Sequence, residues 1–438
     1  MLTEFKSHLQ NNFPFLENSK FLLAISGGID SVVLAHLLRE LNLDFSLCHC
    51  NFKLRGDESE ADEVFVKNLA NRLDLNIFTT SFDTESYVKE NKQSIQIAAR
   101  NLRYQWFYEL IKTHKFNYIL TAHNANDNLE TFIINLTRGT GLEGLTGIPP
   151  INKKSIRPLL KFTRDQIKMY AIKNGVEWRE DKSNANVKYI RNKVRQQILP
   201  ILQEINPNMI EGFGNTLEYL KVSQQILKEK VNEVAEKISV VENGIIKLDI
   251  KKLKKLENIK GYLYEILSPY HFTEWNDVYH LIDAQPGKQL FSKTHRLLKD
   301  RNYLLLTSID ENNSFKNPVR ILQNQTEITS PIHIKFSEVQ KEALTDKHSI
   351  IVDKDLLKYP LYIRKWNYGD AIHPTGMRGS KKVSQLFKDR KLSLIEKEKI
   401  WILSNANDDI IWVMGMRQDR RFKSTSDTEK SLKISLIN

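Results

Sequence analysis

The residue types best suited to chemistry stand in one short segment near the start of the chain. Ser26-Gly27-Gly28-Ile29-Asp30-Ser31 directly follows an apolar run at residues 21–25 and opens a segment with helical periodicity. Two glycines let the backbone approach an anion closely, and a helix N-terminus offers unpaired N–H groups with a partial positive charge. We therefore predict that this segment binds a phosphate chain, with Asp30 holding Mg²⁺ against it. The alternative is an ordinary strand–turn–helix connection in which Ser and Asp only cap the helix.

Two other glycine-rich nucleotide motifs are excluded. The Walker A pattern G-x-x-x-x-G-K-[ST] occurs nowhere in the sequence. Residues 139–144 match G-x-G-x-x-G, but they follow a predicted helix, whereas a dinucleotide fingerprint must follow a strand. We therefore interpret residues 139–144 as the glycine-rich end of that helix.

An alternation of strands and helices must position the loop. Short apolar runs predict strands buried on both faces of a sheet, and apolar residues at three- and four-residue intervals predict helices. The alternation predicts a doubly wound parallel α/β sheet with right-handed crossovers and a ligand crevice beyond the carboxyl ends of its strands. The predicted strands are residues 21–25, 45–51, 77–82 and 118–123, and the predicted helices are residues 30–41, 58–73, 94–114 and 128–138.

The pattern changes near residue 200. Residues 208–241 indicate a long Lys/Glu-rich helix, residues 287–308 a set of short strands, and residues 308–325 a polar linker. The remainder mixes short strands with one charged helix. We therefore predict an α/β domain at residues 1–207, a mainly helical middle domain at 208–315 and a small α+β domain at 316–438.

The charge and the cysteine content indicate what kind of partner the protein binds and in which cellular compartment it works. The 438 residues include 65 Lys and Arg against 53 Asp and Glu, a net charge of +12, of which +7 (21 basic minus 14 acidic) lies in residues 331–438. A basic terminal domain favours a polyanionic partner. The start lacks an apolar signal core, and no run approaches the ~18 apolar residues of a membrane span. Cys48 and Cys50 are the only cysteines, too few for a tetrahedral metal site. The sequence therefore predicts a cytoplasmic protein in a reducing compartment.

An ordered set of motifs accompanies the loop. The spacing of residues 26–31 resembles the PP-loop of the ATP pyrophosphatase superfamily, whose members cleave ATP between its α- and β-phosphates to adenylate a substrate. The whole set resembles the tRNA(Ile)-lysidine synthase family over nearly the full chain. In the first half the motifs are residues 49–59, 99–104, 121–131, 136–145, 157–160, 177–184 and 189–195, and in the last quarter they are residues 364–370, 374–376, 379–382, 387–391 and 412–415.

The resemblance implies a reaction and its reactants. It implies a carbon–nitrogen ligase that uses ATP and Mg²⁺ to join the ε-amine of free L-lysine to C2 of the wobble cytidine in the CAU anticodon of tRNA(Ile). Attack of the cytosine O2 on the α-phosphate would give an adenylated cytidine and pyrophosphate, and lysine would then displace AMP. The anticodon, now carrying lysidine, would read AUA instead of AUG.

The motif positions also imply roles for particular side chains. Asp127 is expected to hold or deprotonate lysine, since a charged ammonium cannot attack; helix N-capping is the alternative. His123 and Glu130 are further candidates for binding lysine or Mg²⁺, with a structural histidine and a helix-dipole carboxylate as the alternatives. Arg100 and Arg103 share a helix face and could brace the α-phosphate or form surface ion pairs. The expected catalytic residues are Asp30, Asp127 and Arg103.

A base that reacts in this crevice must leave its stack, so the protein must bind tRNA elsewhere through phosphates. The candidate contacts are Arg191, Arg195, Arg378, Lys381, Lys382, Lys388 and Arg390.

Three other functions compete with lysidine formation. A sulfur-inserting enzyme would need more cysteines to ligate a cluster, and an amidating synthetase would usually need a glutaminase domain. The intact phosphate loop and Asp127 argue against the third alternative, a non-catalytic RNA-binding protein that inherited a nucleotide-binding fold.

Overall fold

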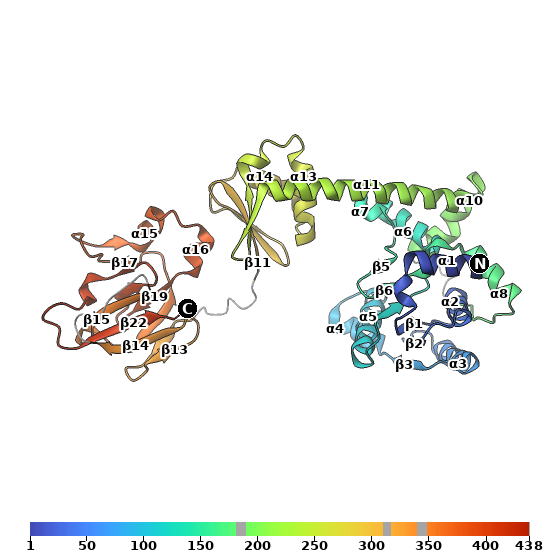
Figure 1. Cartoon of the computed structure of the whole chain (residues 1–438), viewed down its shortest axis with the longest axis horizontal. Coiled ribbons are helices and arrows are strands. Elements are labelled where there is room, and N and C mark those ends of the chain that lie inside the picture. The colour runs from blue at the N-terminus through green and yellow to red at the C-terminus, as the bar shows by residue number, and fades with distance from the viewer. Residues whose placement is uncertain (181–189, 310–316, 340–347, 438) are drawn as a thin grey trace. The chain divides into compact units, whose positions relative to one another are not determined.

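The computed structural model describes residues 1–180, 190–309, 317–339 and 348–437 (Figure 1). The described chain divides into two compact units, Met1–Lys228 and Glu229–Asn438. Our division at residues 207 and 315 stays a prediction. Residues 181–184 and 189 of the predicted motifs, and residues 310–316 of the predicted linker, lie outside the described residues.

The first unit is built on a six-stranded sheet whose order is β3-β2-β1-β4-β6-β5. All of its neighbours are parallel except β5 and β6, which pair as an antiparallel edge. The predicted parallel sheet is therefore confirmed. The strands are β1 (Phe21–Ala24), β2 (Phe45–Asn51), β3 (Ile77–Ser81), β4 (Tyr118–Leu120), β5 (Ile151–Asn152) and β6 (Ser155–Ile156).

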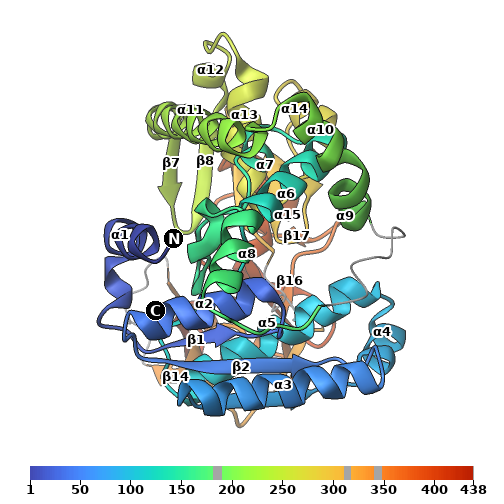
Figure 2. The ribbon, with the colours of Figure 1, turned by 90° about the vertical axis from the view of Figure 1, so that its right-hand side faces the viewer.

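Helices cover both faces of this sheet, as a doubly wound fold requires. Successive residues of β1 point to opposite faces: Leu23 packs with α2 and α3, and Leu22 packs with α5. Figure 2 shows α2 and α3 running alongside β1 and β2. The helices of this unit are α1 (Leu2–Asn12), α2 (Ile29–Glu40), α3 (Asp57–Leu73), α4 (Thr84–Asn91), α5 (Ile95–Thr113), α6 (Ala125–Thr137), α7 (Leu142–Leu145), α8 (Arg164–Lys173), α9 (Ile190–Lys193) and α10 (Leu199–Ile205).

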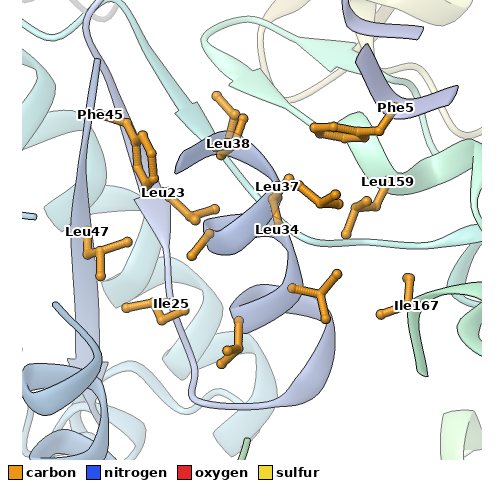
Figure 3. Close-up of a cluster of buried hydrophobic side chains, with 14 of the residues drawn as sticks. Phe5, Leu23, Ile25, Leu34, Leu37, Leu38, Phe45, Leu47, Leu159 and Ile167 are labelled. Atoms are coloured by element: carbon orange, nitrogen blue, oxygen red, sulfur yellow. The ribbon is translucent and has the colours of Figure 1, made fainter. Parts of the chain in front are cut away.

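The largest core holds α2 against the sheet. Leu34, Leu37 and Leu38 of α2 are fully buried, and they belong to the same cluster as Leu23 and Phe45 of the strands (Figure 3). Burying a leucine side chain contributes about 1.5–3 kcal/mol. This packing fixes the start of α2, and therefore the loop before it, relative to β1.

The strand order places a topological switch point between β1 and β4. The chain proceeds from β1 to β2 and β3 on one side, and then returns to β4 on the other. Loops that leave the two strands at a switch point diverge and open a crevice, where open α/β sheets bind their ligands. The two loops here are residues 25–28, after β1, and residues 121–124, after β4.

The second unit contains antiparallel sheets. The long helix α11 (Met209–Ile238) leads into a five-stranded sheet of order β7-β8-β11-β10-β9. Its strands are β7 (Ser239–Glu242), β8 (Ile245–Asp249), β9 (Gln289–Phe291), β10 (His295–Lys299) and β11 (Tyr303–Ser308), and its helices are α12 (Ile250–Leu253), α13 (Ile259–Leu267) and α14 (Trp275–Leu281). The middle region contains the helices that we predicted. It also contains a sheet, of which we expected the strands within residues 287–308 but not β7 and β8.

The C-terminal part packs two further sheets around one core. Ile363, Leu403 and Trp412 of one sheet share a buried cluster with Ile350 and Ile434 of the other. The first sheet contains β12 (Val319–Ile321), β16 (Leu361–Lys365), β19 (Trp401–Ser404), β20 (Ile410–Val413) and β21 (Arg417–Gln418), and the second contains β13 (Glu327–Ile328), β14 (Ile334–Val339), β15 (Ser349–Asp353) and β22 (Ser431–Leu436). A ribbon of β17 (Ala371–Ile372) and β18 (Lys381–Lys382) adjoins α15 (Val383–Asp389) and α16 (Leu394–Lys399).

Four sequence-based boundaries were wrong. The helix predicted at 208–241 ends at Ile238, and the β-branched residues beyond it form β7, where they pair with β8. The predicted linker at 308–325 contains β12. Two short helices, α15 and α16, replace the one charged helix expected near the end. The strand predicted at 118–123 ends at Leu120, because Asn124 already caps the next helix.

Candidate active site

The predicted phosphate loop joins β1 to α2 as expected. Gly28 is the N-cap of α2, and no side chain caps that helix among the described residues. The hydroxyls bond within the loop instead: Ser31 Oγ donates to the Gly28 carbonyl at 2.9 Å and accepts from the Ser26 N–H at 3.2 Å. The first N–H groups of α2 are therefore left for an anion. The alternative, in which Ser and Asp only cap the helix, is not what the structure contains.

Gly27 allows the loop to turn back on itself. Its φ is +85°, which L-residues with a Cβ rarely adopt. A Cβ added there would lie 3.5 Å from Phe65 Cδ1 and 3.6 Å from Val66 Cγ1, so α3 packs closely behind the loop.

Asp30 connects this loop to the one that follows β4. Asn124 Nδ2 donates to Asp30 Oδ1 at 3.0 Å, although 94 residues separate them in the chain. Burial raises the pKa of Asp30, and the negative charge of Asp127 raises it further. Two of the three predicted catalytic residues, Asp30 and Asp127, therefore lie together at the switch point.

A capping box positions Asp127. Asn124 is the N-cap of α6: its Oδ1 accepts the Asp127 N–H at 3.0 Å, and Asp127 Oδ2 accepts the Asn124 N–H at 3.0 Å. Sequence reasoning assigned no role to Asn124. An Asn three residues before an acid, next to an apolar run, was the available signal. Asp127 thus takes part in capping the helix, which was our alternative interpretation, through its Oδ2. Its Oδ1 is not part of the capping box.

Two arginines converge on the carboxylates of α6. Arg195 donates from Nε to Glu130 Oε1 at 2.6 Å, and from Nη2 to Glu130 Oε2 at 3.1 Å and to Asp127 Oδ1 at 3.0 Å. Arg191 Nε lies 3.1 Å from Glu130 Oε2. The Glu130 side chain is completely buried, and burial raises its pKa while Arg195 opposes that shift. That Arg191 and Arg195 contact tRNA stays a prediction; in this structure both guanidinium groups pair with these acids.

His123 lies beside this cluster. Its Nδ1 is 3.0 Å from Thr121 Oγ1, and burial, opposed by Asp127 and reinforced by Arg157 and Arg191, lowers the pKa of His123 to about 4. The imidazole is therefore neutral at pH 7, in a form that can accept a proton or ligate a cation.

We expect the NMR signal of the His123 ring to stay constant between pH 8 and 5.5. The imidazole protonates only near pH 4 in the folded chain, against 6.5 for the unfolded reference. Its contribution to stability is accordingly complete above pH 6.5 and declines as the pH falls toward 4. Comparison with His123→Gln assigns the signal, and a titration midpoint near 6.5 would contradict this environment.

Arg100, Arg103 and His49 have other immediate neighbours. Arg103 lies over the Phe52 ring at 5.2 Å and Arg100 over the Tyr104 ring at 4.8 Å. Both arginines are exposed on α5. His49 is buried, and its Nδ1 donates to the Ile25 carbonyl at 2.9 Å, which supports the strand that leads into the loop. The catalytic role of Arg103 stays a prediction.

The site suits a magnesium ion that is shared with phosphates. No cluster of three or more His, Cys, Asp or Glu suitable for a metal occurs among the described residues. Mg²⁺ usually takes one or two carboxylates and completes its shell with water and substrate phosphate oxygens. Asp30, at the mouth of the phosphate loop, provides such a carboxylate, so the residues present fit the ion.

The C-terminal candidates for tRNA contact come from one segment of the fold. The ribbon pairs Ile372 with Lys381 and Ala371 with Lys382, and α15 follows at once. Lys381 pairs with Asp389, whereas the other candidates are exposed. These exposed candidates are Arg378, Lys382, Lys388 and Arg390.

A glycine loop after the first strand of a parallel sheet, at its switch point, is typical of α/β proteins that bind nucleotides. A family model described as a PP-loop domain matches residues 1–202. Two further models match, the TilS substrate binding domain over residues 241–309 and the TilS substrate C-terminal domain over residues 361–436.

Curated relatives match almost the whole chain. The tRNA(Ile)-lysidine synthase of Parabacteroides distasonis is 36% identical, covering 96% of both chains. That of Bacteroides thetaiotaomicron is 34% identical, covering 98% of both, and that of Bacillus subtilis is 29% identical, covering 94% of this chain and 93% of its own. The chain belongs to the tRNA(Ile)-lysidine synthase family.

Proposed function

We propose that this protein ligates L-lysine to C2 of the wobble cytidine of tRNA(Ile) bearing a CAU anticodon, at the expense of ATP. The cytosine O2 attacks the α-phosphate, the bond to the β-phosphate breaks, and pyrophosphate leaves. Lysine then attacks C2 and AMP departs, so that the anticodon reads AUA. Since the substrate is tRNA, we propose that the reaction takes place in the cytoplasm. No described helix has the length and apolar character that crossing a bilayer requires.

The observation that carries this proposal is the hydrogen bond between Asn124 and Asp30. It joins the phosphate loop to the loop that leads into α6, the helix that bears Asp127, so the groups proposed for adenylation and for amine attack lie at the same switch point. Proximity of this kind can supply a large part of a rate enhancement. Mg²⁺, when bound, would neutralise developing phosphate charge, and Asp30 is the residue that would hold it.

Asp127 is our candidate for receiving lysine. A lysine ammonium must lose a proton before it attacks, and a carboxylate can bind the ammonium and accept that proton. Glu130 has both oxygens paired with arginines, so it acts on lysine only by exchanging one of them. The neutral imidazole of His123 is a third candidate for accepting the proton.

The exposed cations of the ribbon and α15 are our candidates for gripping tRNA away from the site. Phosphate contacts of this kind supply affinity without reading sequence. The segment carries four exposed basic side chains within residues 378–390, namely Arg378, Lys382, Lys388 and Arg390.

Sulfur transfer is disfavoured by the two cysteines. Burial raises the pKa of Cys50 to about 12 and that of Cys48 well above its ordinary value. The thiolate is the nucleophilic form, so neither side chain is suited to carry a persulfide at neutral pH.

A direct assay tests the function. Purified protein, ATP, Mg²⁺ and radiolabelled lysine should label tRNA(Ile) bearing CAU, with one AMP and one pyrophosphate released for each lysine incorporated. Elongator tRNA(Met), which carries the same anticodon, is the matched control. Absence of label from tRNA(Ile) with folded protein would reject the function.

A further inference from the structure

One buried carboxylate on α3 holds two arginines, Arg55 from just before the helix and Arg179 from 117 residues further along the chain than the carboxylate. Arg179 Nε donates to Asp62 Oδ1 at 2.5 Å, and Arg55 Nη2 donates to Asp62 Oδ2 at 2.7 Å. The Asp62 side chain is 12% exposed, whereas the arginines are 36% and 33% exposed. A carboxylate with both oxygens engaged and little access to water restricts both partners strongly.

Arg179 also contacts the phosphate loop through its main chain. The Arg179 N–H donates to the Gly27 carbonyl at 2.9 Å. A trans peptide is planar, so the C=O of Gly27 and the N–H of Gly28 point in opposite directions. Holding that carbonyl against Arg179 therefore directs the Gly28 N–H into the loop, where it donates to Ser26 Oγ at 3.3 Å.

The same face of α3 supports the loop a second time. Asp62, Phe65 and Val66 are spaced at i, i+3 and i+4, so they share one side of the helix. Phe65 and Val66 pack behind Gly27, at the distances given above. One helix face thus limits the movement of Gly27 through packing and fixes its carbonyl through Asp62 and Arg179.

We infer that Asp62 is a positioning residue for the phosphate loop: through Arg179 it fixes the orientation of the Gly27–Gly28 peptide and so the conformation of the loop that receives the nucleotide. The inference rests on the proposed use of ATP at this loop. Asp62 acts through Arg179 and does not touch substrate. Without the charge of Asp62, Arg179 loses its anchor, the Gly27–Gly28 peptide turns more freely, and the ATP phosphates meet a less ordered loop.

Asp62→Asn in the full chain should raise the KM for ATP about tenfold, with the KM for lysine and the Kd for tRNA within twofold of the wild type. A merely structural role would affect all three together. An unchanged KM for ATP, or equal losses for ATP and lysine, would overturn the inference. Glu63→Gln is the matched control, because Glu63 is the next residue of α3 and pairs with Lys67 instead.

Arg179→Met tests the other end of the contact and remains informative if Asp62→Asn folds poorly. It keeps the main-chain N–H but removes the guanidinium, so it should raise the KM for ATP to the same degree. The double variant should be no worse than either single variant within about twofold, since both break one interaction. Multiplied effects would show that the residues act separately and would overturn the inference.

Calorimetric titration with ATP separates this inference from the proposed function. Wild-type protein should bind ATP more tightly than Asp62→Asn by the same factor, whether or not lysidine is formed. If the wild-type protein forms no lysidine but still binds ATP more tightly than Asp62→Asn, only the proposed reaction is rejected. Equal ATP affinity rejects the role of Asp62.

Discussion

Asp30→Asn should lower the rate of lysidine formation about 10²–10³-fold, while the affinity for tRNA stays within twofold of the wild type. The substitution keeps the shape of the side chain and an oxygen that can accept from Asn124. It removes the negative charge that Mg²⁺ and the phosphate loop need. ATP–pyrophosphate exchange and filter binding of tRNA measure the two effects separately.

The same variant should not unfold the protein. Burial and Asp127 raise the pKa of Asp30, so the stability this group contributes is present at low pH and is lost as the pH rises through its folded pKa. At neutral pH the charged carboxylate costs stability, and Asn relieves that cost. The melting temperature should therefore stay equal or rise. A fall in both the melting temperature and the ATP–pyrophosphate exchange rate would show that Asp30 is structural. Asp74→Asn is the control, because the Asp74 side chain is 98% exposed.

Arg195→Met should destabilise the first unit by up to about 3–5 kcal/mol, because the buried Glu130 loses its main partner and keeps only Arg191 at Oε2. Glu130 is completely buried, and Arg195 engages both of its oxygens. Hydrogen exchange of the α6 amides in the full chain reports this unit alone. Faster exchange in α6, with little change in β15 or β22 of the second unit, is the expected pattern.

A second substitution separates charge from packing. Glu130→Gln combined with Arg195→Met removes both charges and should restore most of the lost stability. If the double variant is as unstable as Arg195→Met alone, the effect comes from packing and not from the ion pair. Arg72→Met is the matched control: Arg72 pairs with Glu177 at 2.6 Å on the surface, where such pairs contribute about 0–1 kcal/mol.

Local patterns predicted the elements of the first unit well. The strand at residues 45–51, helices within one residue of α2, α3 and α5, and a helix that starts three residues late in α6 follow from apolar periodicity, which burial on a sheet imposes. Gly139, with φ +70° after the end of α6, confirms that a glycine ends this helix, but residues 142–144 were wrongly placed in the same loop, because they begin α7. The sequence pattern was less informative where tertiary pairing decides the structure. The residues of β7 are flanked by polar residues like those of α11, and their pairing with β8 is what makes them a strand.

The sequence by itself determined which groups the chain could use: a glycine loop that opens a helix, acids after the fourth strand, and a basic terminal segment. Those depend on neighbours within a few residues, through φ preferences, capping and periodicity. Only the tertiary structure decided which of them meet. Asn124 on Asp30, Arg195 on Glu130 and Arg179 on Gly27 join positions 94, 65 and 152 residues apart. Such partners are chosen by strand order and burial, because a buried charge must find its counter-charge wherever the fold brings one.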